Sequence, residues 1–188
     1  MFVALDLPHE VRTGIEEWGR GELTDPALRP VAAQSLHITL AFLGYRPEKD
    51  AEQVIAAMRE SAGPAPLIEL GDPLPRPARG KPRLFALPAL SPGAEQMQAQ
   101  LSEILISAGL YEPEKRPFWP HVTVARVRAE GRGSRRPMLV EDAPGPLPAE
   151  LSEPFYGVRI SLYRSELKPS GARYVPLAQV ELPGAGRQ

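Results

Sequence analysis

Two segments of this chain share a pattern in which a histidine and a threonine alternate with apolar residues. Residues 35–44 read SLHITLAFLG and residues 120–126 read PHVTVAR. The chain contains 3 histidines, and two of them stand in this pattern. Alternation of this kind is typical of a strand with one buried face. Each segment is therefore predicted to be a β-strand, and the pair constrains the fold more than any other feature of the sequence.

Side chains two residues apart on a strand point to the same face. His37 and Thr39 therefore share one face of the first strand, and His121 and Thr123 share one face of the second. The apolar residues between them, such as Ile38, point into the core on the other side. Each strand thus presents an imidazole and a hydroxyl on a rigid support, and we expect the two strands to face each other across a cleft.

The rest of the chain surrounds these strands with further strands and helices. Strands are predicted at residues 2–7, 36–43, 67–70, 84–87, 121–128, 158–165 and 174–182, and helices at 9–22, 48–62 and 93–108. Segments rich in Pro, Gly and charged residues predict loops at 24–34, 71–83, 111–120, 131–137 and 144–148, and a turn at 168–171. Because no linker is long enough to separate domains, we predict an α+β fold in which residues 1–188 form a single domain of two related lobes.

The composition limits the classes of partner and chemistry. The formal net charge is −1 and the pI about 6.3, without the basic excess of a protein that coats long nucleic acid. A nucleic-acid partner is therefore expected to be held over a short footprint, such as a strand end. The chain has no cysteine, which excludes disulfides, thiolate zinc sites and cysteine nucleophiles. Without a secretory signal or a long apolar run, we expect no membrane association and a cytoplasmic location.

Two histidines and two hydroxyls without a carboxylate cluster suit chemistry on a phosphodiester. Such a reaction needs a base to activate the attacking oxygen and an acid to protonate the leaving oxygen, and histidine can serve as either near neutral pH. The threonine hydroxyls can donate hydrogen bonds to the non-bridging phosphate oxygens. Two facing strands would place base and acid on opposite sides of the phosphorus.

The same residues allow other interpretations. A single His-x-Thr on a strand is more often structural, but two copies in matching apolar surroundings favour a functional pair. A metal site is not expected, because neither motif supplies Cys, Asp or Glu, and two histidines fall short of the usual zinc ligand sets. His9, at the start of a predicted helix, is expected to be a surface residue. No cofactor is expected.

The paired motifs and their surroundings resemble the 2H phosphoesterase superfamily. The resemblance is strongest to its bacterial branch, the RNA 2′,3′-cyclic phosphodiesterases that were first described as 2′-5′ RNA ligases. Nearly the whole chain takes part in it, through FVALDL at 2–7, HITLAFLG at 37–44, KPRL at 81–84, PFWPHVTVAR at 117–126, LYRSEL at 162–167 and GARY at 171–174. It implies a bilobal, pseudo-twofold fold in which two antiparallel sheets flank a central groove, with helices on the outside.

The resemblance also implies a reaction and a set of roles. The reaction is metal-independent hydrolysis of a 2′,3′-cyclic phosphate at an RNA 3′ end to a 2′-phosphomonoester, with reversible 2′-5′ joining of RNA, in RNA processing. By analogy His37 is the proton donor and His121 the proton acceptor, while Thr39 and Thr123 hold the phosphate. The pseudo-symmetry of such a site leaves the reverse assignment of acid and base open.

Phe42 and Arg126 carry over from the resemblance as the residues that sandwich the terminal base. Strict alternation opposes this, because each lies five residues after its histidine and would point to the opposite face. A bulge near Ala41 and Ala125 would resolve the conflict. Without one, both side chains would be structural.

Two questions stay open at the level of sequence. The basic segment 128–136 and the pair Lys115-Arg116 either follow upstream RNA phosphates or are ordinary solvated loops. The activity on RNA ends has two alternatives, a module that binds nucleotides or RNA ends without turnover, and a cyclic phosphodiesterase acting on small 2′,3′-cyclic nucleotides. The protein is expected to act as a monomer.

Overall fold

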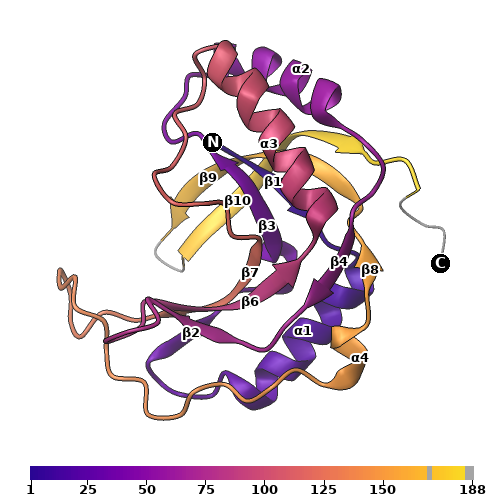
Figure 1. The fold of residues 1–188 in the computed structure, drawn as a ribbon. Coiled ribbons are helices and arrows are strands. Elements are labelled where there is room, and N and C mark those ends of the chain that lie inside the picture. Colours follow the sequence, from indigo (N-terminus) through magenta and orange to yellow (C-terminus); the bar gives the residue numbers. More distant parts are fainter. Residues whose placement is uncertain (169–170, 185–188) are drawn as a thin grey trace.

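The computed structural model, described here for residues 1–168 and 171–184, is an α+β fold built on one curled antiparallel sheet (Figure 1). The strand order is β10-β9-β1-β3-β7-β6-β4-β8, with β2 paired to β7 and β5 to β6. The strands are β1 (Phe2–Asp6), β2 (Leu28–Pro30), β3 (His37–Phe42), β4 (Leu67–Leu70), β5 (Leu74–Arg76), β6 (Leu84–Leu90), β7 (His121–Val127), β8 (Phe155–Tyr156), β9 (Arg159–Lys168) and β10 (Gly171–Glu181). The helices are α1 (His9–Glu22), α2 (Ala51–Ser61), α3 (Pro92–Ser107) and α4 (Ala149–Ser152), with 3-10 turns η1 (Ala33–Ser35) and η2 (Glu48–Asp50).

The two predicted His-x-Thr strands, β3 and β7, lie side by side at the centre of the sheet. They pair at one position only, Ile38 opposite Val122, and then diverge. The two expected sheets are therefore the halves β10-β9-β1-β3 and β7-β6-β4-β8 of one continuous sheet, joined at this position.

The helices do not pack only against the strands that are their neighbours in the sequence. α3 follows β6 in the chain but contacts β3, and α2 packs beside α3 against β9 and β10. α1 follows β1, yet its buried face, with Ile15, lies beside Val124 of β7. Figure 1 shows α2 and α3 over one half of the sheet and α1 under the other. Each lobe is thus assembled from both halves of the chain.

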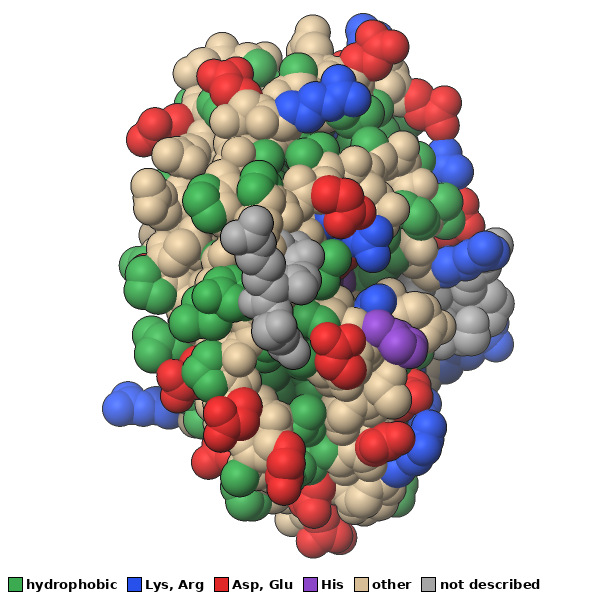
Figure 2. Space-filling model, turned by 90° about the vertical axis from the view of Figure 1, so that its right-hand side faces the viewer, with side chains coloured by type: hydrophobic (Ala, Val, Ile, Leu, Met, Phe, Trp, Pro, Cys, Tyr) green, Lys and Arg blue, Asp and Glu red, His purple; other side chains and the backbone are tan. Residues whose placement is uncertain are grey.

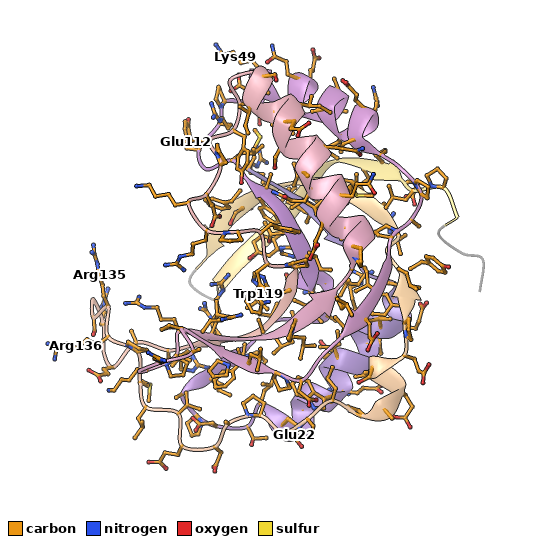
Figure 3. All side chains as sticks on the ribbon, viewed as in Figure 1. Glu22, Lys49, Glu112, Trp119, Arg135 and Arg136 are labelled. Carbon is orange, nitrogen blue, oxygen red and sulfur yellow. The ribbon has the colours of Figure 1, made fainter. Side chains whose placement is uncertain are left out.

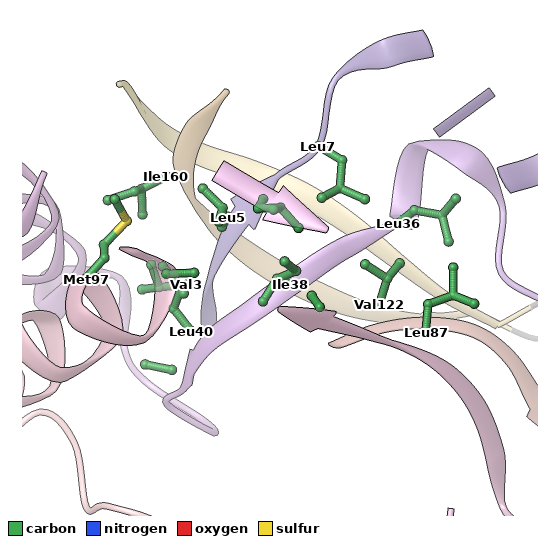
Figure 4. Close-up of a cluster of buried hydrophobic side chains, with 14 of the residues drawn as sticks. Val3, Leu5, Leu7, Leu36, Ile38, Leu40, Leu87, Met97, Val122 and Ile160 are labelled. Atoms are coloured by element: carbon green, nitrogen blue, oxygen red, sulfur yellow. The ribbon is translucent and has the colours of Figure 1, made fainter. Parts of the chain in front are cut away.

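The hydrophobic core runs through the junction between the halves. Ile38, Val122, Val3 and Leu87 have no exposed surface, and Met97 of α3 closes the cluster on one side. Figure 4 shows these side chains converging from β1, β3, β6 and β7. The apolar members of both motifs are therefore core residues, as the alternation predicts.

Two predicted loops contain short strands that the sequence pattern did not reveal. Segment 24–34 holds β2 and η1, and segment 71–83 holds β5. Each of these strands has three residues including a proline, and each pairs with a single neighbour, which is where a sheet tolerates proline. α4 and β8 were also not predicted. Residues 169–170 of the predicted turn at 168–171 lie outside the described residues.

The surface differs from one side of the molecule to another. Figure 2 views the side away from the loops 111–120 and 128–137, and acidic side chains cover much of its lower part. Across residues 1–168 and 171–184, none of the helices has the length and apolarity needed to span a membrane.

The junction between the sheet halves yields a stability prediction. Ile38→Ala should lower the free energy of unfolding by about 2–5 kcal/mol, because it leaves a cavity at a fully buried site. Leu90→Ala on β6 is the matched control, since that side chain is 66% exposed and its loss should cost far less. Urea denaturation measures both, and equal losses in the two variants would contradict this role of the junction.

Candidate active site

Both His-x-Thr strands contain a β-bulge at the same point of the motif. Across the β1–β3 pair, Val3 lies opposite Ala41 but Ala4 lies opposite Thr39, so Leu40 is an extra residue. Across the β6–β7 pair, Phe85 lies opposite Ala125 but Ala86 lies opposite Thr123. The extra residue there is Val124. In each strand the bulge residue and the alanine after it are both buried, which shifts the alternation by one position.

The bulges settle which way Phe42 and Arg126 face. After the shift, both residues lie on the same sheet face as the histidines and threonines, and both are exposed, Phe42 by 61%. The objection from strict alternation is thereby removed for both residues. The structure brings all six predicted residues to one face: His37, Thr39, Phe42, His121, Thr123 and Arg126.

The single β3–β7 pair also sets how the two motifs oppose each other. In an antiparallel pair with Ile38 opposite Val122, the flanking positions lie diagonally about a local twofold axis. His37 is therefore on the side of Thr123, and Thr39 is on the side of His121. Each end of the motif pair therefore carries one imidazole and one hydroxyl, and the two imidazoles lie diagonally across the pair.

The imidazole of His37 is held by a hydrogen bond and by aromatic rings. Its Nδ1 lies 2.8 Å from the carbonyl oxygen of Ser35, which only accepts, so Nδ1 carries the proton. The neutral ring then has its lone pair on Nε2, to which the Thr39 hydroxyl donates at 3.1 Å. Phe2 stacks on the ring with centroids 5.0 Å apart, and Tyr174 meets it edge-on at 5.4 Å.

His121 has the same tautomer as His37 but stacks on a different aromatic ring. Its Nδ1 donates to the carbonyl oxygen of Trp119 at 2.7 Å, which leaves Nε2 as the basic atom. The Trp119 ring stacks on the imidazole with centroids 4.2 Å apart and planes 14° from parallel. The Arg76 guanidinium covers the far face of the indole, 3.7 Å from its centroid. Figure 3 places Trp119 between the two halves of the molecule.

Burial favours the neutral form of both histidines. It lowers the pKa of His37 to about 4, and the charges of His121 and Arg126 act in the same direction, against the hydrogen bond to Ser35. Burial also lowers the pKa of His121, helped by Arg76 and Arg126. An anion bound against the two Nε2 atoms would oppose these shifts, because it favours the charged imidazole.

A groove of about 1040 Å³ opens beside His121 and Thr39. Thr39, Phe42 and His121 line it, together with Trp119 and residues of the loop 111–119. Among the described residues, no group of three or more His, Asp or Glu side chains is placed to hold a metal ion.

The sequence analysis missed the aromatic residues that enclose His37. Phe2, Tyr163 and Tyr174 come from β1, β9 and β10, and Tyr163 also stacks on Phe2. Asp6, a buried carboxylate, accepts hydrogen bonds from the hydroxyl groups of Tyr163 and Ser161 and so fixes the tyrosine. The clean alternation of 158–165 identified a strand, but pairing of β9 with β1 is a contact across the whole chain that no local pattern reveals.

Comparison with known proteins decides the family. The family model of the 2′-5′ RNA ligase superfamily matches residues 7–164. The chain belongs to this superfamily. The chain is 33% identical to the RNA 2′,3′-cyclic phosphodiesterase of Thermus thermophilus over 98% of its length and 90% of the relative's. It is 29% identical to the enzyme of that name from Escherichia coli, over 94% of this chain and 93% of the relative.

Solved structures of superfamily members have the same fold. TT0787 of Thermus thermophilus superposes with a TM-score of 0.76 at 31% identity, covering 97% of both chains. E. coli LigT complexed with 3′-AMP superposes with a TM-score of 0.75 at 27% identity, covering 96% of both chains. The predicted α+β 2H phosphoesterase fold is thus confirmed.

The half-buried His37 makes the stability of this superfamily member depend on pH. In the unfolded chain His37 titrates near 6.5 and in the folded protein at about 4, so the unfolded state binds the extra proton between these values. The free energy of unfolding should therefore fall as the pH drops from about 6.5 to 4, with up to about 3 kcal/mol from this residue. In His37→Gln that contribution should vanish. Urea titrations at several pH values measure it, and an unchanged pH dependence in the variant would contradict the half-buried neutral imidazole.

Proposed function

We propose that this protein hydrolyses the 2′,3′-cyclic phosphate at RNA 3′ ends and leaves a 2′-phosphomonoester. The observation that carries the proposal is the pair of imidazoles with matching tautomers and basic Nε2 atoms, which lie on the same sheet face as two threonine hydroxyls. The curated relatives from Thermus thermophilus and Escherichia coli are named RNA 2′,3′-cyclic phosphodiesterases, which supports the same substrate here.

The proposed step takes one proton from the attacking water and gives one proton to the leaving oxygen. His121 removes a proton from water as its oxygen bonds to phosphorus, and His37 gives a proton to the 3′ oxygen as its bond to phosphorus breaks. Attack and departure in line require base and acid on opposite sides of the phosphate, which the opposed placement of the two histidines supports. The hydroxyls of Thr39 and Thr123 donate to the non-bridging oxygens, where negative charge is concentrated. The imidazoles supply the acid and base without a metal ion.

The acid must carry a proton when the phosphate is bound. The pKa of His37 is about 4, so at neutral pH this ring gains its proton only with the phosphate anion against Nε2. The reverse assignment, with His37 as base, needs no such change of its protonation state. Both assignments use the same four side chains, and a change of leaving group distinguishes them.

The same groove supports recognition of the terminal nucleoside. Phe42 offers an exposed ring on one strand and Arg126 a guanidinium at the matching position of the other, and we propose that they sandwich the base. If a 5′ hydroxyl of a second RNA takes the place of water, the same step joins the two RNAs through a 2′-5′ linkage, in keeping with the description of the superfamily.

The proposed reaction takes place within one copy of the chain. All the groups it uses come from residues 1–188 of one chain and from both lobes, so we propose that the chain acts as a single domain and as a monomer. The lack of cysteine fits a cytoplasmic location.

Incubation with an oligonucleotide that ends in a 2′,3′-cyclic phosphate tests the reaction. The product should carry a 2′-phosphate, identified by chromatography against 2′- and 3′-phosphate standards, and EDTA should leave the rate unchanged. His37→Ala and His121→Ala should each reduce kcat by about 10²–10⁴-fold, because each removes a proton-transfer group. Tight binding of the cyclic end without any turnover by the wild-type protein would contradict the proposal.

A substrate with sulfur in place of the 3′ oxygen separates acid from base. Thiolate leaves without being protonated, so the loss caused by His37→Ala should shrink by at least about tenfold on this substrate, whereas the loss caused by His121→Ala should persist. The comparison uses kcat on the oxygen and sulfur substrates with each variant. Rescue of His121→Ala in place of His37→Ala would reverse the assignment.

A further inference from the structure

The groove contains positive charge that the proposed chemistry does not use. Three arginines line it and form no ion pair with any described residue: Arg76, Arg83 and Arg116. Outside the groove, the described cations that form ion pairs are Arg20, Lys81, Arg159 and Arg164, and what sets the groove arginines apart is that they line one groove in which Glu114 is the acidic residue. In a protein with a net charge of −1, this local excess points to an anionic ligand.

The two halves of the sheet place different side chains at equivalent positions. In one half the row across the strands is Phe42, Phe2 and Tyr163, which lie opposite one another on β3, β1 and β9. In the other half the corresponding row is Arg126, Leu84 and Arg76 on β7, β6 and β5. The fold is pseudo-twofold, but one row is aromatic and the other contains two arginines. Of these residues, Phe42, Leu84 and Arg76 line the groove, so it offers a ring that suits a base and a guanidinium that suits a phosphate.

The groove extends well past the residues needed for one nucleotide. Beyond Phe42 and His121 it continues between the end of β5, the start of β6 and the loop 111–119, where Arg83 and Arg116 line it and Glu114 is the acidic residue. Its volume of about 1040 Å³ is at the upper end of the range for pockets that hold a single small ligand.

Arg76 stands at the boundary between the histidines and this extension. Its guanidinium lies over the Trp119 ring, and its Nε is buried without a hydrogen-bond partner among the described residues. On α3, the amide of Gln98 donates to the hydroxyl of Ser102 at 2.8 Å, and both side chains line the groove. This pair keeps a free carbonyl oxygen and further donors that can meet the edge of a base.

We propose that this extension is a second nucleotide subsite, which holds the nucleotide on the 5′ side of the cyclic end. Arg76, Arg83 and Arg116 bind the phosphate that links the two nucleotides, and the Gln98–Ser102 pair faces the upstream base. The proposal rests on the proposed function, and it sharpens the substrate class. The preferred substrate is an oligonucleotide of at least two residues, not a 2′,3′-cyclic mononucleotide.

The basic segment 128–136 is not part of this subsite. The Arg128 side chain donates to the backbone carbonyls of Pro26 and Leu28, which is a structural role. Figure 3 shows Arg135 and Arg136 at the tip of this loop, far from Trp119. Of the two basic segments noted in the sequence, the one that lines the groove is therefore the pair with Arg116.

A series of three substrates tests the subsite: adenosine 2′,3′-cyclic phosphate, the same compound with a 5′-phosphate, and the dinucleotide ApA ending in the cyclic phosphate. In the wild type, kcat/KM should rise along the series, by about tenfold or more for the dinucleotide over the first compound. In Arg83→Gln/Arg116→Gln, the ratio of kcat/KM for the dinucleotide to kcat/KM for adenosine 2′,3′-cyclic phosphate should fall towards one. The control Arg132→Gln/Arg135→Gln removes the same charge outside the groove and should keep the wild-type ratio.

The outcomes distinguish the subsite from the reaction itself. A flat series in the wild type, or an equal loss of the ratio in both double variants, would overturn the subsite while the hydrolysis stands. If the wild type cleaves none of the three compounds, the proposed function fails. Calorimetric binding of the same series still tests the subsite in that case, and tighter binding of the dinucleotide, weakened in Arg83→Gln/Arg116→Gln alone, would support it.

Discussion

The molecule depends on one contact between its two central strands. β3 and β7 pair only where Ile38 meets Val122, and both side chains are fully buried. This contact joins the two sheet halves on the core side of the sheet, while the His and Thr side chains of the two motifs diverge on the opposite side. A longer ladder would flatten the sheet and bring the strands parallel along their length, whereas a single pair lets the halves curl away and open a groove. The Ile38–Val122 pair therefore determines both the packing of the core and the shape of the candidate site.

The sequence predicted the parts of the site that depend on local pattern. Alternation correctly placed His37 and Thr39 on one face, with Ile38 in the core. It failed to decide the direction of Phe42, because one inserted residue reverses the facing of everything that follows. A bulge leaves no clear mark in a run such as HITLAFLG, where the residues on either side are apolar.

Other parts depend on contacts between distant segments and were beyond sequence reasoning. The rings around His37 come from β1, β9 and β10, and nothing local ties Tyr163 to a histidine more than a hundred residues earlier. The short strands β2 and β5 contain Pro30 and Pro75 and are strands only because β7 and β6 offer them free edges. Arg76, Arg83 and Arg116 are far apart in the sequence, and only the fold shows that they line one groove.

The central position of the first strand has a consequence for the protein during its synthesis. β1 lies between β3 and β9, and β9 comes from the last part of the chain. Until β9 and β10 emerge from the ribosome, β1 is an open edge and His37 lacks the rings of Tyr163 and Tyr174. A nascent chain that already contains both His-x-Thr motifs should therefore be inert towards RNA, and the last strands to be made act as the step that switches the molecule on.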